Sequence, residues 1–184
     1  MSNIVTLPEL VTIIGQALKE LDKHVRQTAA SPVGGGVLRY VNERWYQLEA
    51  FRALLTRWNV EPERRRHDLV IMDTEGKEQA IIEMKWFFPS LQPGYLHSDL
   101  EKLRACKCAG YMILFGQTAN GPVRQQLEGL QKQIPELDAD KVETFTFPTT
   151  FGSKEVEFWV AGWQILTSRP QRHQTDDMSP VLAA

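Results

Sequence analysis

Two short apolar runs joined by a turn place the strongest constraint on how this chain folds. The runs read LVIM and AII, at residues 69–72 and 80–82, and the turn between them contains TEGK, whose glycine can adopt a positive φ angle. An Asp opens the first run and Glu-Met-Lys closes the second, although an unpaired buried carboxylate is costly. The sequence therefore predicts a β-hairpin whose open end carries Asp68, Glu83 and Lys85.

The pairing of this hairpin predicts where the three side chains lie. If Glu75 and Gly76 form a two-residue loop, the numbers of paired residues keep a constant sum, and Asp68 pairs with Glu83. Directly opposed side chains project from the same face, with Cβ atoms roughly 4.5–5.5 Å apart. Lys85 lies two residues beyond Glu83 and shares that face. A slip of one residue would put the acids on opposite faces.

Paired carboxylates at the end of a sheet predict a cation between them. Two such groups repel each other unless a cation or a proton lies between them. Oxygen ligands on a rigid scaffold suit Mg²⁺, or Mn²⁺ in its place, which takes one or two protein carboxylates and keeps waters for a substrate phosphate. A lysine beside that ion can orient a water or stabilise developing negative charge. The pattern indicates metal-assisted chemistry on a phosphate.

At these residues the chain resembles the PD-(D/E)XK nucleases, which have the restriction-endonuclease-like fold. The resemblance covers residues 40–116 and implies that Asp68 and Glu83 bind the divalent metal and that Lys85 is the catalytic lysine. His67 stands where the family has a proline. The family's core has the order αβββαβ, and one of its strands has no counterpart among the predicted elements.

The same resemblance implies a further acid from the helix before the hairpin. The segment NERWYQLE offers Glu43 and Glu49 as this metal ligand and catalytic residue. We favour Glu43 because it lies near the start of that helix, with Gln47 one turn on and on the same side. The apolar residues predicted to form the buried face of this helix are Val41, Trp45, Leu48, Phe51, Leu55 and Trp58.

The remaining patterns predict the elements around the hairpin. Apolar residues at helical spacing predict helices over residues 7–28 and 40–58, and NVEPERRR reads as a polar connection. Ser98 with Glu101 fits a capping box that opens another helix, and Pro122 fits the first turn of the last helix. YMILFG reads as a strand buried on both faces, and VETFTF and VEFWVAGWQI as two more strands. The predicted fold is α/β (α+β), a restriction-endonuclease-like mixed β-sheet flanked by helices, with an extra N-terminal helix.

Length and composition are those of an ordinary globular chain. The 184 residues predict one nuclease-like domain over 1–167, with an N-terminal amphipathic helix in 1–30 and the motif-bearing core in 40–116, followed by a flexible tail at 168–184. No apolar run reaches membrane-spanning length, no signal-peptide pattern opens the chain, and two cysteines are too few for a disulfide framework. These features predict a cytoplasmic protein with no membrane partner.

Two functions of different classes fit these observations. The first is a Mg²⁺- or Mn²⁺-dependent nuclease that hydrolyses phosphodiester bonds of nucleic acid, with DNA as the expected partner. The second is a non-catalytic binding or assembly module that retains the nuclease fold. The convergent acids and lysine favour the first, whereas the net charge of −2 favours the second, or a nuclease directed by a targeting partner protein.

The apolar stripe of the first predicted helix allows two packings. The stripe covers residues 7–25 and precedes the nuclease-like core. It either packs on that core or on its copy in a homodimer. We favour the homodimer, because cutting two strands benefits from two sites.

Overall fold

A mixed β-sheet organises the part of the chain that the computed structural model describes, which is residues 4–28, 42–87, 93–151 and 153–166. Its strands are β1 (Asn59–Pro62), β2 (Leu69–Met72), β3 (Glu78–Trp86), β4 (Ala109–Gln117), β5 (Glu143–Phe151) and β6 (Lys154–Ile165). They lie in the order β1-β2-β3-β4-β6-β5, and the neighbours are antiparallel except for the parallel pair β3 and β4. The predicted hairpin, β2 and β3, therefore lies near the middle of the sheet.

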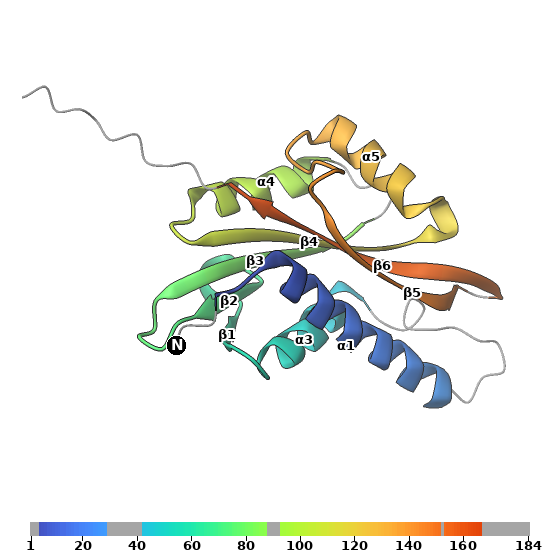
Figure 1. The fold of residues 1–184 in the computed structure, drawn as a ribbon, viewed down its shortest axis with the longest axis horizontal. Helices are drawn as coiled ribbons and strands as arrows, with labels where there is room; N and C mark the ends of the chain where they lie inside the picture. Colours follow the sequence, from blue (N-terminus) through green and yellow to red (C-terminus); the bar gives the residue numbers. More distant parts are fainter. Residues whose placement is uncertain (1–3, 29–41, 88–92, 152, 167–184) are drawn as a thin grey trace, which may run out of the picture.

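Helices cover both faces of this sheet (Figure 1). The described residues form the α-helices α1 (Leu7–Thr28), α3 (Glu43–Leu54), α4 (Pro93–Ala105) and α5 (Val123–Gln133), and the 3-10 turns η1 (Arg64–Arg66) and η2 (Thr118–Asn120). Helices α1 and α3 lie on one face, and α4 and α5 lie on the other. The mixed α/β class and the flanking helices are thus confirmed. None of the described helices combines the length and apolar character needed to cross a bilayer.

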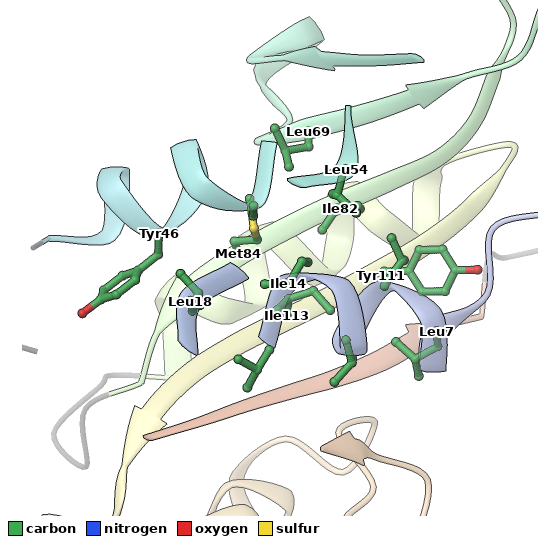
Figure 2. Close-up of a cluster of buried hydrophobic side chains, with 14 of the residues drawn as sticks. Leu7, Ile14, Leu18, Tyr46, Leu54, Leu69, Ile82, Met84, Tyr111 and Ile113 are labelled. Atoms are coloured by element: carbon green, nitrogen blue, oxygen red, sulfur yellow. The ribbon is translucent and has the colours of Figure 1, made fainter. Parts of the chain in front are cut away.

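The N-terminal helix packs on the sheet of its own chain. Its apolar stripe, with Leu10, Ile14 and Leu18 fully buried, belongs to the core between α1, α3 and the strands. Figure 2 shows this cluster, whose labelled members are Leu7, Ile14, Leu18, Tyr46, Leu54, Leu69, Ile82, Met84, Tyr111 and Ile113. Of the two packings considered for this stripe, the structure shows packing on the core. The favoured packing of the stripe, on its copy in a homodimer, is therefore wrong, and a homodimer as such stays a prediction.

The sequence interpretation misses one strand. Residues 59–62 form β1, an edge strand paired with β2, where a polar connection was expected. Val60 is buried and pairs with Ile71, while Asn59 and Pro62 are exposed. A short edge strand tolerates proline and polar side chains, because only one of its edges has to donate to a neighbour. Its sequence therefore looks like that of a loop.

The buried face of α3 differs from the prediction. The helix buries Tyr46, Ala50 and Leu54, while Trp45 and Leu48 are nearly half exposed. The Tyr46 ring stacks on Trp86 at a centroid distance of 5.1 Å, which turns the Tyr46 side of the helix toward the sheet. Two neighbouring faces of this helix are apolar, so apolar spacing alone does not select between them. Of the other expected members, Trp58 is buried after the helix end, Phe51 is partly buried and Leu55 is exposed; Val41 and the predicted tail at 168–184 lie outside the described residues.

Helix α4 begins five residues before its predicted start. It runs from Pro93, so Ser98 and Glu101 lie inside the helix and do not form a capping box at its beginning. Proline is favoured in the first helical turn because its missing N–H needs no partner there. The sequence does contain this second start signal, upstream of the Ser98 signal.

Two helix glycines provide a test of how α1 is seated. A Cβ atom built on Gly15 of α1 would lie 2.4 Å from two ring carbons of Phe145 in β5, whereas one built on Gly129 of α5 meets nothing within 4 Å. Gly15→Ala should therefore lower the free energy of unfolding by about 1–3 kcal/mol through overpacking. Gly129→Ala should raise it by about 0.5–1 kcal/mol through helix propensity. Denaturant unfolding measures both, and equal stabilisation by the two substitutions would contradict this seating of α1.

Candidate functional site

The predicted register of the hairpin is the observed one at its open end. Leu69 pairs with Ile82 and Val70 pairs with Ile81. Continuing this register by one residue brings Asp68, which directly precedes β2, opposite Glu83. The acids are thus on one face of the sheet, as expected.

The turn end of the hairpin differs from the two-residue loop that the prediction assumed. Met72 pairs with Glu78, and a register shift lies between Ile71 and Met72. The Asp73 carboxylate accepts hydrogen bonds from the backbone N–H groups of Glu75 and Lys77, each at 2.8 Å, and so stabilises a wider turn. The bulge offsets the wider turn, and the register expected near the acids is kept.

Because β3 is longer than β2, two of the acids can bind to its backbone. Strand β2 begins at Leu69, whereas β3 continues past Ile82 to Trp86. Side-chain carboxylates accept hydrogen bonds from the backbone N–H groups of this extension. Asp68 Oδ2 accepts from the Met84 N–H at 2.7 Å, and Glu43 Oε2 accepts from the Trp86 N–H at 2.9 Å. Buried backbone donors need partners, so these bonds hold both acids at the end of β3.

Of the two glutamates considered on α3, Glu43 is the one at this site. Its Oε1 atom lies 3.6 Å from Nζ of Lys85, while its other oxygen is bound to the backbone of β3. Glu49 instead pairs with Arg52 of its own helix at 3.1 Å. The structure therefore brings Glu43, Asp68, Glu83 and Lys85 together.

Glu83 is the most deeply buried of these acids. Its side chain is 1% exposed, and its Oε1 atom contacts Nδ1 of His67 at 2.7 Å. Burial, together with the charges of Asp68 and Asp99, raises the pKa of Glu83 to about 8. Burial also lowers the pKa of His67, with the Lys102 charge adding to the effect. Burial among like charges thus favours the protonated form of Glu83.

The neighbouring groups follow the same electrostatics. Burial raises the pKa of Asp68, although the Met84 N–H and the Lys85 charge oppose the change. Burial would lower the pKa of Lys85, but the carboxylates of Asp68, Asp99 and Glu43 outweigh it and the net pKa is raised. Lys85 is therefore a firmly charged ammonium group among acids.

Helix α4 supplies two residues that the sequence interpretation did not single out. Asp99 Oδ1 accepts from Lys102 Nζ at 2.6 Å, and Asp99 Oδ2 lies 3.3 Å from Lys85 Nζ. Lys102 Nζ also lies 3.9 Å from Glu83 Oε1. A signal for Asp99 exists, because Leu96, Leu100 and Leu103 form the buried stripe of α4 and Asp99 falls within it. A helix predicted to begin at Ser98 leaves out Leu96, so the stripe around Asp99 is not recognised.

A constrained loop joins β1 to β2 and positions His67 and Asp68. The Glu63 N–H donates to the Asp68 carbonyl at 3.0 Å, which closes the loop. Glu63, Arg65 and Arg66 all have positive φ angles, an uncommon conformation for residues other than glycine. The guanidinium groups of Arg64 and Arg65 pair with Glu78 at the far end of β3. Two of the three consecutive arginines before His67 are thus paired with an acid.

The charges of this cluster fit a divalent cation. Glu43, Asp68, Glu83 and Asp99 contribute four carboxylates, against the two ammonium groups of Lys85 and Lys102. An ionised cluster therefore has an excess of negative charge, and carboxylate oxygens are the ligands that Mg²⁺ and Mn²⁺ prefer. Among the described residues, no three Asp, Glu, His or Cys side chains are arranged as a ready-made metal site. The fit to a divalent cation therefore rests on the oxygen ligands, on the excess of negative charge and on the raised pKa of Glu83.

Comparisons of the chain with protein-family models, with curated proteins and with solved structures found no match. The resemblance to the PD-(D/E)XK nucleases therefore rests on the residues and on the order of the elements.

The raised pKa of Glu83 predicts how stability depends on pH without divalent metal. A proton held more tightly in the folded state contributes stability below the ordinary pKa of 4.5, and this contribution is lost as the pH rises toward about 8. The Glu83→Gln side chain cannot ionise, so the variant does not lose this contribution. Its free energy of unfolding, relative to that of the parent protein, should therefore increase as the pH rises over this range. The gain should not exceed about 1.4 kcal/mol per pH unit for one carboxyl group. Denaturant unfolding in EDTA measures the difference, and a difference independent of pH would contradict the burial of an ionisable Glu83.

Proposed function

We propose that this protein is a divalent-metal-dependent nuclease that hydrolyses phosphodiester bonds of nucleic acid, with DNA as the expected substrate. The observation that carries the proposal is the group of carboxylates around Lys85 at the end of β3, with the buried Glu83 raised in pKa to about 8. Strongly shifted groups with a specific charged neighbour are typical of functional sites. The location also fits, since ligands of open α/β sheets bind at the carboxyl ends of parallel strands such as β3 and β4.

The order of elements supports the restriction-endonuclease-like assignment. With β1 recognised, the chain from α3 to β4 reads α3, β1, β2, β3, α4, β4. This is the αβββαβ order of the PD-(D/E)XK core, including the strand that the sequence interpretation had not located. Asp68 directly precedes the second of these strands, and Glu83 and Lys85 lie on the third, where the resemblance expects them.

Each residue of the cluster has a distinct role in the proposed reaction. Asp68 and Glu83 provide oxygens that hold Mg²⁺ or Mn²⁺, and Glu43 contributes directly or through a water. When bound, the metal ion supplies Lewis-acid stabilisation of the phosphate oxygens and lowers the pKa of a water. Lys85 orients the attacking water and offsets negative charge on the five-coordinate phosphate of the transition state, because its ammonium group is fixed beside the acids.

The hydrolysis itself needs only water as a second reactant. The water oxygen forms a bond to phosphorus as the bond from phosphorus to the leaving sugar oxygen breaks. One water proton passes to solvent, and the leaving oxygen takes up a proton. No oxidation or reduction occurs.

The alternative, a non-catalytic module with the same fold, does not need this arrangement. Buried acids with raised pKa values destabilise the folded state at neutral pH, so a binding module would gain stability by losing them. The direct test of the proposal is incubation of the purified protein with single- and double-stranded DNA and RNA in Mg²⁺, Mn²⁺ or EDTA. Cleavage in either metal and not in EDTA is expected, and no cleavage of any substrate would overturn the proposal.

Substitutions at the site separate the roles of its residues. Asp68→Ala and Glu83→Ala should abolish cleavage, because each removes a carboxylate that would hold the metal. Lys85→Ala should keep the metal affinity and lower kcat by about 10²- to 10³-fold, since its role lies in the transition state. Cleavage rates and calorimetric Mn²⁺ titrations measure these effects. Three variants that cut as fast as the parent would contradict the assignment.

A matched pair on α3 tests the upstream acid. Glu43→Gln removes the carboxylate beside Lys85, whereas Glu49→Gln removes one that pairs with Arg52 on the same helix. Glu43→Gln should reduce cleavage by about tenfold or more, as expected for loss of a ligand or of a group that orients one. Glu49→Gln should cut at the parent rate. The reverse order of effects would assign the role to Glu49.

A further inference from the structure

Asp99 holds both ammonium groups of the candidate site. Its side chain is 6% exposed, and one oxygen binds Lys102 Nζ at 2.6 Å while the other lies 3.3 Å from Lys85 Nζ. It projects from α4, whereas Asp68 and Glu83 belong to the hairpin. A carboxylate buried to this degree needs compensating charge, and the two lysines provide it.

The distances show how Asp99 competes with Glu83 and Glu43 for these lysines. Lys102 Nζ is 2.6 Å from Asp99 and 3.9 Å from Glu83, although both carboxylates lie within ion-pair range. Lys85 Nζ is likewise closer to Asp99, at 3.3 Å, than to Glu43, at 3.6 Å. Without Asp99, the nearest carboxyl group left for Lys102 would be that of Glu83, the acid that the proposed function assigns to metal binding.

We propose that Asp99 is a positioning residue that holds Lys102 and Lys85 on the α4 side of the site and so keeps Glu83 available to a divalent cation. The inference rests on the proposed metal-dependent function and extends it to the regulation of metal affinity by α4. In this arrangement, removing Asp99 frees Lys102 to move onto the Glu83 carboxyl group and to pair with it in its ionised form. An ammonium group at that position competes with the cation for the same carboxylate.

A double-mutant cycle on Mn²⁺ binding tests this role. The variants are Asp99→Asn, Lys102→Gln and the two combined, and Glu101→Gln serves as a control that removes an exposed acid from the same helix. The full-length protein is titrated with Mn²⁺ by calorimetry, so the readout does not depend on cleavage. Thermal unfolding of each variant confirms that it is folded.

The proposal expects strong coupling between the two positions. Asp99→Asn should weaken Mn²⁺ binding by about 10- to 100-fold, the range for groups that orient metal ligands. Lys102→Gln alone should change the dissociation constant by no more than about twofold, whereas in the Asp99→Asn background it should restore most of the lost affinity. A residue with a merely structural role would not be rescued in this way.

Other outcomes overturn either this inference or the proposed function, and they are distinguishable. If the two effects add, or if Asp99→Asn weakens binding no more than Glu101→Gln does, Asp99 acts only through its net charge and the inference is wrong. If the parent binds no Mn²⁺, both the inference and the metal-dependent function are wrong. If the coupling is found but no nucleic acid is cut, the role of Asp99 stands and the proposed reaction is wrong.

Discussion

The candidate site depends on the fact that β3 extends beyond the strand it pairs with. Strand β2 begins at Leu69, so the N–H groups of Met84 and Trp86 find their partners in the carboxylates of Asp68 and Glu43. Backbone donors in a partly buried setting need acceptors, and charged acceptors make the stronger bonds. Acids from a loop and from α3 are therefore held at the end of one strand.

Once these acids are in place, their charges determine the state of the surrounding groups. Glu83 is almost fully buried among like charges, so its protonated form is favoured and its pKa is raised to about 8. Lys85 and Lys102 offset part of the negative charge, and Asp99 takes the closest position to both of them. In the proposed function a divalent cation would take the place of this proton, which is the first requirement of the proposed chemistry.

Strand pairing made part of this site predictable. The register of an antiparallel pair fixes which residues share a face, so the sequence could place Asp68, Glu83 and Lys85 together. The assumed two-residue turn was wrong, but the register shift between Ile71 and Met72 offsets the longer turn and leaves the pairing near the acids unchanged. Asp99 could not be placed, since its position on the buried face of α4 depends on where that helix begins, and two start signals compete there. The edge strand β1 and the buried face of α3 also depend on tertiary partners, which local patterns do not contain.

The number of protons released when Mn²⁺ binds tests the central claim most directly. Calorimetric titrations at pH 7 in two buffers of different ionisation enthalpy give this number. Because the pKa of Glu83 is about 8, binding to its carboxylate should release about one proton per ion, and Glu83→Gln should release almost none. Mn²⁺ binding without proton release, or equal release by the parent and by Glu83→Gln, would contradict the claim that the buried glutamate exchanges a proton for the metal.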